Sequence, residues 1–160
     1  MRENDCGKMT DRQKQIAEKQ RELYLNNWFK KLSGIEVLEI YDKDKNVELC
    51  TMYETYLPTY RIENGSMPYS KLPFSSAKSE IYAWILQNMK IMAQKEYFLY
   101  NSVWIKIRVL DADLAVESLW EASGDLGILL AQTDYSCILE VGADSRDEEN
   151  YLIDIWEYHR

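Results

Sequence analysis

Two long stretches of the chain have the polar and apolar pattern of helices. In residues 10–32, Thr10 and Gln13 have the form of a capping box, and no glycine or proline follows before Gly34. In residues 76–96, apolar side chains recur every three or four positions behind a serine cap. The pattern therefore predicts one main helix over each stretch.

Other stretches alternate apolar and polar side chains, which is the period of a half-buried strand. Residues 35–41 and 47–57 alternate in this way, and the polar run between them predicts that they pair as a hairpin. Residues 97–110 have the longest alternation and predict one strand. Further strands are predicted over residues 127–133, 135–141 and 151–158.

Two stretches lack a clear period. Residues 58–74 hold all three prolines of the chain and are predicted to be a long loop. Residues 111–124 fit either a short helix capped by Asp113 or a further strand, and we favour the strand.

The order of these elements is helix, hairpin, loop, helix and then a run of strands. Strands grouped in this way indicate an α+β fold rather than an alternating α/β fold. We therefore predict a mostly antiparallel sheet with two main helices, about 10–32 and 76–96, packed on it. Residues 10–160 are predicted to form a single domain, and the polar residues 1–9 a disordered N-terminus.

The composition is that of a globular protein. Of the 160 residues, 46% are hydrophobic and 29% are charged, which is unlike a disordered chain. The three cysteines lie far apart and are odd in number, so a reducing compartment is expected. Neither a secretory signal nor a membrane-spanning run is visible, so we expect a cytoplasmic protein without a membrane partner.

The charge of the chain is uneven along its length. The formal net charge is -8, and residues 111–160 hold thirteen acidic side chains against two arginines. Residues 1–34 hold eight basic side chains against five acidic ones. No lysine follows Lys106. Excluding one sign of charge costs self-repulsion, which a basic partner would offset while it also speeds encounter.

Aromatic side chains lie among these acids, and exposed aromatic residues ringed by charge are typical interface anchors. The predicted partner-binding residues are Trp120, Glu121, Asp134, Tyr135, Glu140, Asp144, Asp147, Glu148, Glu149, Asp154, Trp156 and Tyr158. A solvated strand face is the alternative interpretation, because acids that alternate with apolar side chains occur there too. The absence of lysine after Lys106 favours the partner-binding interpretation over a solvated strand face.

Catalytic and metal-binding patterns are incomplete. Asp111 and Asp113 follow a predicted strand and could hold Mg²⁺ or Mn²⁺, but the Gly65–Ser66 pair that could grip a phosphate lies far away in the chain. The one histidine, His159, lies beside the C-terminus and makes a poor general base. We therefore predict no catalytic residue, cofactor or resident metal. A metal-dependent transferase or hydrolase that uses Asp111 and Asp113 is the second hypothesis.

The first functional hypothesis is a non-enzymatic binding protein. Its profile is that of a small acidic inhibitor or neutraliser, such as a bacterial immunity protein or a phage anti-defence protein, that covers a basic surface of a protein partner. A toxin or a defence nuclease would offer such a surface. Direct binding to nucleic acid is not expected, because the chain lacks a basic groove to neutralise phosphates. A third hypothesis is a structural homo-oligomer, in which the basic N-terminal helix docks on the acidic C-terminal segment of a neighbouring copy.

Overall fold

The computed structural model of the chain describes residues 9–42, 45–60, 67–124 and 127–159, with residues 59 and 60 as backbone only. The predicted disordered N-terminus, residues 1–9, lies outside this description except for Met9. Two compact units divide the chain after Leu32.

The first unit contains helix α1 (Asp11–Phe29), which begins with the predicted capping box. The Gln13 amide donates to Thr10 Oγ1 at 3.2 Å, and the Thr10 amide donates to Gln13 Oε1 at 2.9 Å. These two bonds satisfy amide groups that have no partner inside the helix. A helix within residues 10–32 is therefore confirmed, with narrower ends.

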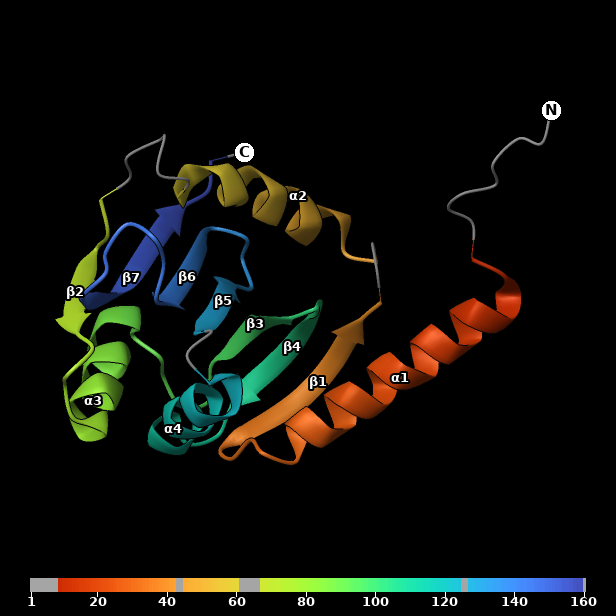
Figure 1. The fold of residues 1–160 in the computed structure, drawn as a ribbon, viewed down its shortest axis with the longest axis horizontal. Helices are drawn as coiled ribbons and strands as arrows, with labels where there is room; N and C mark the ends of the chain where they lie inside the picture. Colours follow the sequence, from red (N-terminus) through yellow and green to blue (C-terminus); the bar gives the residue numbers. More distant parts are fainter. Residues whose placement is uncertain (1–8, 43–44, 61–66, 125–126, 160) are drawn as a thin grey trace. The chain divides into compact units, whose positions relative to one another are not determined.

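The second unit is built on a seven-stranded sheet in which neighbouring strands are antiparallel. The strands follow the order β1-β4-β3-β5-β6-β7-β2 across the sheet (Figure 1). This architecture confirms the predicted α+β fold with a mostly antiparallel sheet. The strands are β1 (Ile35–Tyr41), β2 (Ser70–Pro73), β3 (Glu96–Asn101), β4 (Val103–Val109), β5 (Ile128–Gln132), β6 (Cys137–Gly142) and β7 (Asn150–Glu157).

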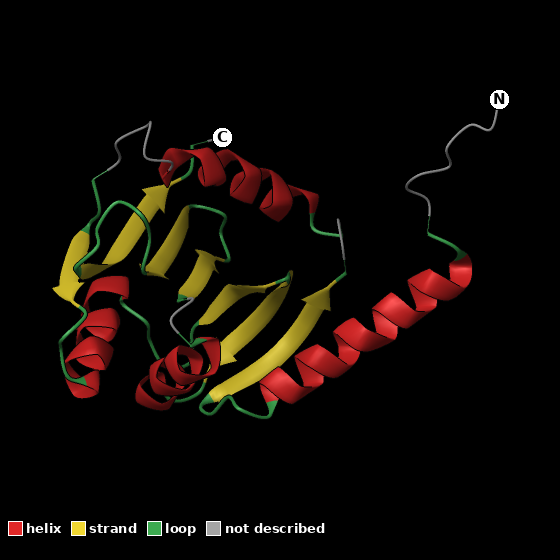
Figure 2. Ribbon diagram, viewed as in Figure 1, coloured by secondary structure: helices red, strands yellow, loops and turns green. Residues whose placement is uncertain are grey.

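Helices of the second unit lie on both faces of this sheet (Figure 2). Helix α2 (Val47–Tyr56) packs with Phe98 of β3 on one face. The adjacent Tyr97 points to the other face, where its hydroxyl accepts from the Met92 amide beyond helix α3 (Lys78–Met89). Helix α4 (Ala112–Ser123) packs beside α3. Among the helices of the described residues, none has both the length and the apolar character needed to cross a membrane.

Each face of the sheet carries a buried core. The cluster under α2 consists of Leu49, Met52, Tyr56, Phe98, Trp104, Leu129, Ala131 and Ile138. On the other face the two helices contribute Ile81, Ile85, Met89, Ala115, Val116, Leu119 and Trp120. The central strands are therefore covered on both faces, which explains why their polar positions are few.

The predicted strand over residues 47–57 is wrong, because this segment forms helix α2. The strand prediction rests on alternation at odd positions such as Val47 and Leu49. The buried side chains are instead Leu49, Met52 and Tyr56, which recur every three or four positions, the spacing of a helix. Asn46 starts the helix, since its side-chain oxygen accepts from the Leu49 amide at 3.0 Å. Burial of the apolar side chains against the sheet stabilises the helix. The predicted hairpin does not form, and β1 pairs with β4 instead.

The strand favoured for residues 111–124 is also wrong, because they form helix α4. Asp111, and not Asp113, is the N-cap: its Oδ1 accepts from the Leu114 amide at 3.0 Å. The buried positions of the segment recur at helical spacing and face the sheet.

Replacing Asp111 with alanine is expected to lower the free energy of unfolding by about 1 kcal/mol, because the Leu114 amide loses its capping partner. Asp113→Ala is the matched control, since Asp113 is exposed in the first turn, where only the helix dipole favours its charge. Urea unfolding of both variants without divalent metal measures the difference. Equal losses would contradict the assignment of Asp111 as the cap.

Three further boundaries differ from the prediction. Residues 97–110 form two strands, β3 and β4, because Ser102 adopts a left-handed φ of 62° and turns the chain without breaking the alternation. The second main helix ends well before residue 96, because Lys90 adopts a φ of 52°. The predicted loop 58–74 contains part of a short 3₁₀ helix, η1 (Leu57–Tyr60), and the edge strand β2.

Candidate functional site

Aromatic side chains gather on the face of the sheet that α2 covers. We call this set the α2-face aromatic cluster: Tyr41, Tyr53, Tyr56, Phe98, Tyr100, Trp104, Tyr135, Trp156 and Tyr158. The antiparallel register places Tyr41 and Tyr100 opposite Trp104 from either side. Three neighbouring strands thus present aromatic side chains in one row.

Tyr53 of α2, Tyr100 of β3 and Trp104 of β4 form a three-ring group within this cluster. The ring centroids lie 4.7 Å apart for Tyr53 and Tyr100, 5.1 Å for Tyr100 and Trp104, and 5.5 Å for Tyr53 and Trp104. These separations lie in the range of favourable aromatic pairs. The group therefore ties α2 to the β3–β4 hairpin.

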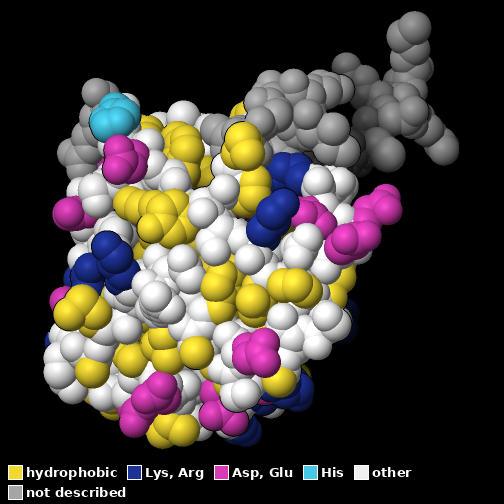
Figure 3. Space-filling model, turned by 90° about the vertical axis from the view of Figure 1, so that its left-hand side faces the viewer, with side chains coloured by type: hydrophobic (Ala, Val, Ile, Leu, Met, Phe, Trp, Pro, Cys, Tyr) yellow, Lys and Arg dark blue, Asp and Glu magenta, His cyan; other side chains and the backbone are white. Residues whose placement is uncertain are grey.

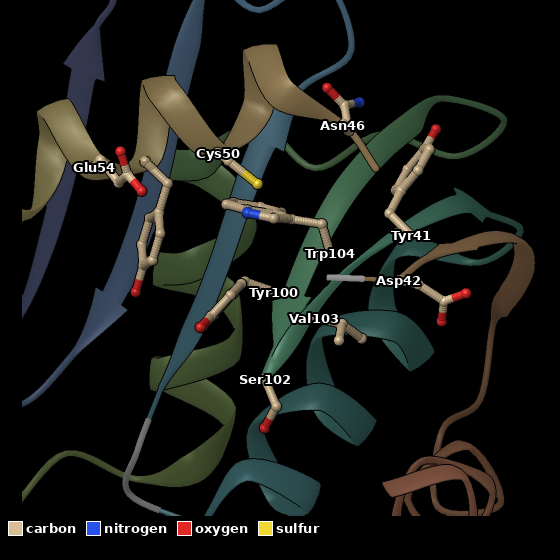
Figure 4. A pocket seen from close by; sticks show the side chains of 10 residues that line it. Tyr41, Asp42, Asn46, Cys50, Glu54, Tyr100, Ser102, Val103 and Trp104 are labelled. Atoms are coloured by element: carbon tan, nitrogen blue, oxygen red, sulfur yellow. The ribbon is translucent and has the colours of Figure 1, made fainter. Parts of the chain in front are cut away.

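A pocket of about 220 Å³ lies beside the three-ring group (Figure 4). In Figure 4 the Trp104 indole lies between Cys50 and Tyr100, while Asp42 and Glu54 lie toward opposite ends of the pocket. Its walls come from the end of β1, from α2 between its N-cap Asn46 and Glu54, and from the β3–β4 hairpin. The lining residues are Tyr41, Asp42, Asn46, Cys50, Tyr53, Glu54, Tyr100, Ser102, Val103 and Trp104.

The charge of this pocket is negative. Asp42 and Glu54 are acidic, and no lysine or arginine is among the ten described residues that line the pocket. Lys45 Nζ lies 3.2 Å from Asp42 Oδ2, but both side chains are more than half exposed, so water screens this ion pair. The pocket therefore favours a cationic ligand.

The phenols of Tyr53 and Tyr41 stay protonated at neutral pH. Burial raises the pKa of Tyr53 to about 12, and the neighbouring Tyr100 and Glu140 add to this shift. Burial and the nearby Glu39 likewise raise the pKa of Tyr41 to about 12. Both rings thus keep a neutral hydroxyl that can donate or accept a hydrogen bond.

Two polar contacts fix α2 above the sheet. The Tyr56 hydroxyl donates to Glu140 Oε2 on β6. The Asn46 side-chain amide donates to the Tyr135 hydroxyl at 3.0 Å, and so links the start of α2 to the turn between β5 and β6. These bonds position the helix residues that line the pocket.

Arg146, in the connection between β6 and β7, lies between two aspartates. Its guanidinium donates to Asp144 Oδ2 at 2.7 Å and to Asp154 Oδ2 at 2.5 Å, with further bonds of 3.0 Å to the second oxygen of each carboxylate. The Arg146 side chain is 9% exposed. This arrangement anchors the connection to strand β7.

The structure does not gather the predicted aromatic anchors at one surface. Trp120 is only 6% exposed and packs edge-on against Tyr151, with ring centroids 5.0 Å apart, on the face of α3 and α4. The expectation that Trp120 is exposed is therefore wrong: it lies on the inward stripe of a helix rather than on a strand. Tyr135, Trp156 and Tyr158 are half-buried in the α2-face aromatic cluster.

The predicted acids also lie at several places. Glu140, Asp144 and Asp154 are half-buried and bonded inside the protein. Two other predicted acids stabilise backbone turns. The Asp134 side chain accepts from the Ser136 backbone amide, and the Asp147 side chain accepts from the Glu149 backbone amide. The exposed ones are Glu121, Asp134, Glu148 and Glu149.

Figure 3 shows one face of the molecule, on which acidic side chains occur in several places, with hydrophobic and basic side chains between these places. The predicted acids come from different elements: Glu121 lies in α4, Asp134 and Glu148 lie in connections between strands, and Glu140 and Asp154 lie opposite each other in β6 and β7.

The two residues of the candidate metal pair lie at the start of α4. Asp111 caps α4, and Asp113 is exposed in its first turn. Within the part of the chain that the structure describes, no group of three His, Cys, Asp or Glu side chains could hold a metal ion. Gly65 and Ser66 lie outside the described residues.

The pocket residues were missed by the sequence-based prediction. Tyr100 and Trp104 both lie in the alternating stretch 97–110, and their even spacing placed them on one face. The sequence therefore indicates that these two aromatic side chains share a face. The sequence does not indicate that Tyr53 lies above them, because this position depends on residues 47–56 being a helix.

Comparison of the chain with protein-family models, with curated proteins and with solved structures found no significant match. The chemistry of the site therefore has to be inferred from its own side chains. These supply aromatic rings, two carboxylates and neutral hydroxyls, which are groups suited to binding a cation.

Proposed function

We propose that this chain is a non-enzymatic binding protein, an acidic inhibitor or neutraliser that covers a basic surface of a protein partner. What supports the proposal most is the charge that the fold leaves exposed. Among the described residues from 111 to 159, Arg146 is the one lysine or arginine, and it is enclosed by two aspartates. The exposed acids are Asp111, Asp113, Glu117, Glu121, Asp134, Glu148, Glu149 and Glu157.

The outer surface of helix α4 illustrates the electrostatic cost. Asp113, Glu117 and Glu121 follow one another at intervals of four residues, and like charges at this spacing destabilise a helix by about 0.2–0.5 kcal/mol per pair. Lys78 Nζ lies 2.8 Å from Glu121 Oε1, but this pair is exposed and screened. A basic partner would offset the remaining repulsion, and the summed negative field of the chain would speed its approach.

The double variant Glu148→Lys with Glu149→Lys is expected to slow association with the partner by about tenfold at low salt, because two steering charges are reversed. The partner is first captured on the immobilised chain, identified by mass spectrometry and purified. Surface plasmon resonance at low and high salt then gives the association rate. Asp147 is left unchanged, because it closes the adjacent turn.

The matched control is Glu18→Lys with Glu22→Lys in helix α1, which changes the net charge by the same amount. This control should slow association much less. The proposal fails if affinity for the partner is insensitive to ionic strength, or if the two double variants slow association equally.

A further inference from the structure

We propose that the pocket beside the three-ring group receives an arginine side chain of the basic partner. The guanidinium would stack on the rings, and Asp42 and Glu54 would balance its charge. This inference rests on the proposed function, since the partner supplies the arginine.

The three rings suit a cation because of their spacing. A cation is attracted to an aromatic face within about 6 Å of the ring centroid. The centroids of Tyr53, Tyr100 and Trp104 lie 4.7–5.5 Å from one another, so one guanidinium can approach more than one ring. Trp104 is almost fully buried and forms the wall, while Tyr53 and Tyr100 are only partly buried.

The charge of the pocket selects a cation over a neutral or anionic group. Asp42 and Glu54 lie toward its two ends, so both carboxylates raise the local concentration of positive charge along its length (Figure 4). The neutral hydroxyls of Tyr41 and Tyr53 can accept hydrogen bonds from N–H groups without adding positive charge.

Arginine matches these walls better than lysine does. Its planar guanidinium stacks on aromatic faces, presents five donors and is more weakly hydrated than an ammonium group. The ammonium of lysine is compact and strongly hydrated, so it loses more when it enters a pocket lined by rings. The exposed pair between Lys45 and Asp42 already holds a lysine outside the ring-lined space.

Nuclear magnetic resonance with N-acetyl-arginine methylamide tests the inference without a partner. The chain has five tryptophans, and Trp104→Phe assigns the indole N–H signal of Trp104. We expect a saturable shift of this signal and of the Ser102 amide. The uncharged citrulline analogue should bind at least about fivefold more weakly, because it lacks the cation.

Substitutions at exposed positions leave the fold intact and are expected to change binding of the arginine probe in opposite directions. Glu54→Gln should weaken binding of the arginine probe about threefold, as expected for one partly screened charge. Lys45→Ala should strengthen it, because Asp42 loses its competing cation. Glu117→Gln on α4 removes the same charge from the opposite face and should leave binding unchanged.

N-acetyl-lysine methylamide is titrated in the same way as a further probe. Three outcomes would overturn the inference: equal shifts with the citrulline analogue, stronger binding of the lysine probe than of the arginine probe, or shifts at the other tryptophans instead of Trp104. The proposed function fails separately. If the arginine probe does not bind while Glu148→Lys with Glu149→Lys still slows partner association, only the pocket assignment is wrong. If the probe binds but the affinity for the captured partner does not depend on ionic strength, the proposed function is wrong.

Discussion

Arg146→Leu is expected to lower the free energy of unfolding by about 3 kcal/mol at neutral pH, because two carboxylates lose their cation inside the protein. The Arg146 side chain is 9% exposed and the Asp154 side chain 14% exposed, so water replaces little of the lost interaction. Leucine keeps part of the packing but none of the four bonds of 2.5–3.0 Å. Urea unfolding followed by circular dichroism measures the loss.

Arg108→Leu is the matched control. Arg108 also lies near two glutamates, but at 3.4 Å and 3.6 Å, and its side chain is 37% exposed. Its replacement should cost about 1 kcal/mol or less. Equal losses for the two arginines would show that Arg146 is not the buried anchor of the β6–β7 connection.

The effect of Arg146→Leu should shrink in acid. Burial alone would raise the pKa of Asp144, but hydrogen bonds from Arg146 outweigh this and lower it. A carboxyl with a lowered pKa in the folded state stabilises the wild type above about pH 4 and loses this contribution as the pH falls through its folded value. In the variant the guanidinium is gone, so protonation of Asp144 relieves repulsion instead. The difference in free energy of unfolding between the wild type and Arg146→Leu should therefore become smaller below about pH 4.

Leu49→Ala is expected to lower the free energy of unfolding by about 3 kcal/mol, because it leaves a cavity between α2 and the sheet. Leu49 is fully buried in the cluster with Met52, Phe98 and Ile138. Those neighbours belong to a helix and two strands, so they cannot collapse easily onto the space. Chemical unfolding at neutral pH measures the change.

Val47→Ala in the same helix is the matched control. Val47 is 69% exposed, and exposed substitutions change stability by about 0.5 kcal/mol or less. Alanine also favours a helix over a β-branched residue. If residues 47–57 were a strand with Val47 and Leu49 on one face, the two substitutions would have similar effects. A large difference between them therefore tests the helix directly.

The limits of the sequence-based prediction are clearest at residues 47–57 and 111–124. Both segments carry apolar residues that fit a period of two and a period of three to four. Asn46 and Asp111 are capable helix caps, but the same residue types also occur in turns. Burial on the sheet decides between these possibilities, and burial depends on partners that are distant in the chain.

Prediction of the candidate site from the sequence is limited in the same way. The even spacing of Tyr100 and Trp104 predicts that they share a face, since strand side chains alternate. Their meeting with Tyr53 requires α2 to cross that face, which local sequence does not reveal. Trp120 was expected among exposed anchors, but the helical period turned it into the core.

The sequence by itself determined the α+β class, the capped first helix and the absence of lysine after Lys106. These properties depend on local spacing and composition, which are read directly from the chain. Only the tertiary structure decided which acids remain exposed and which neutralise Arg146 or bond Tyr56. A charge near an apolar run can point to either side of a sheet, and the register of pairing between distant strands selects the side.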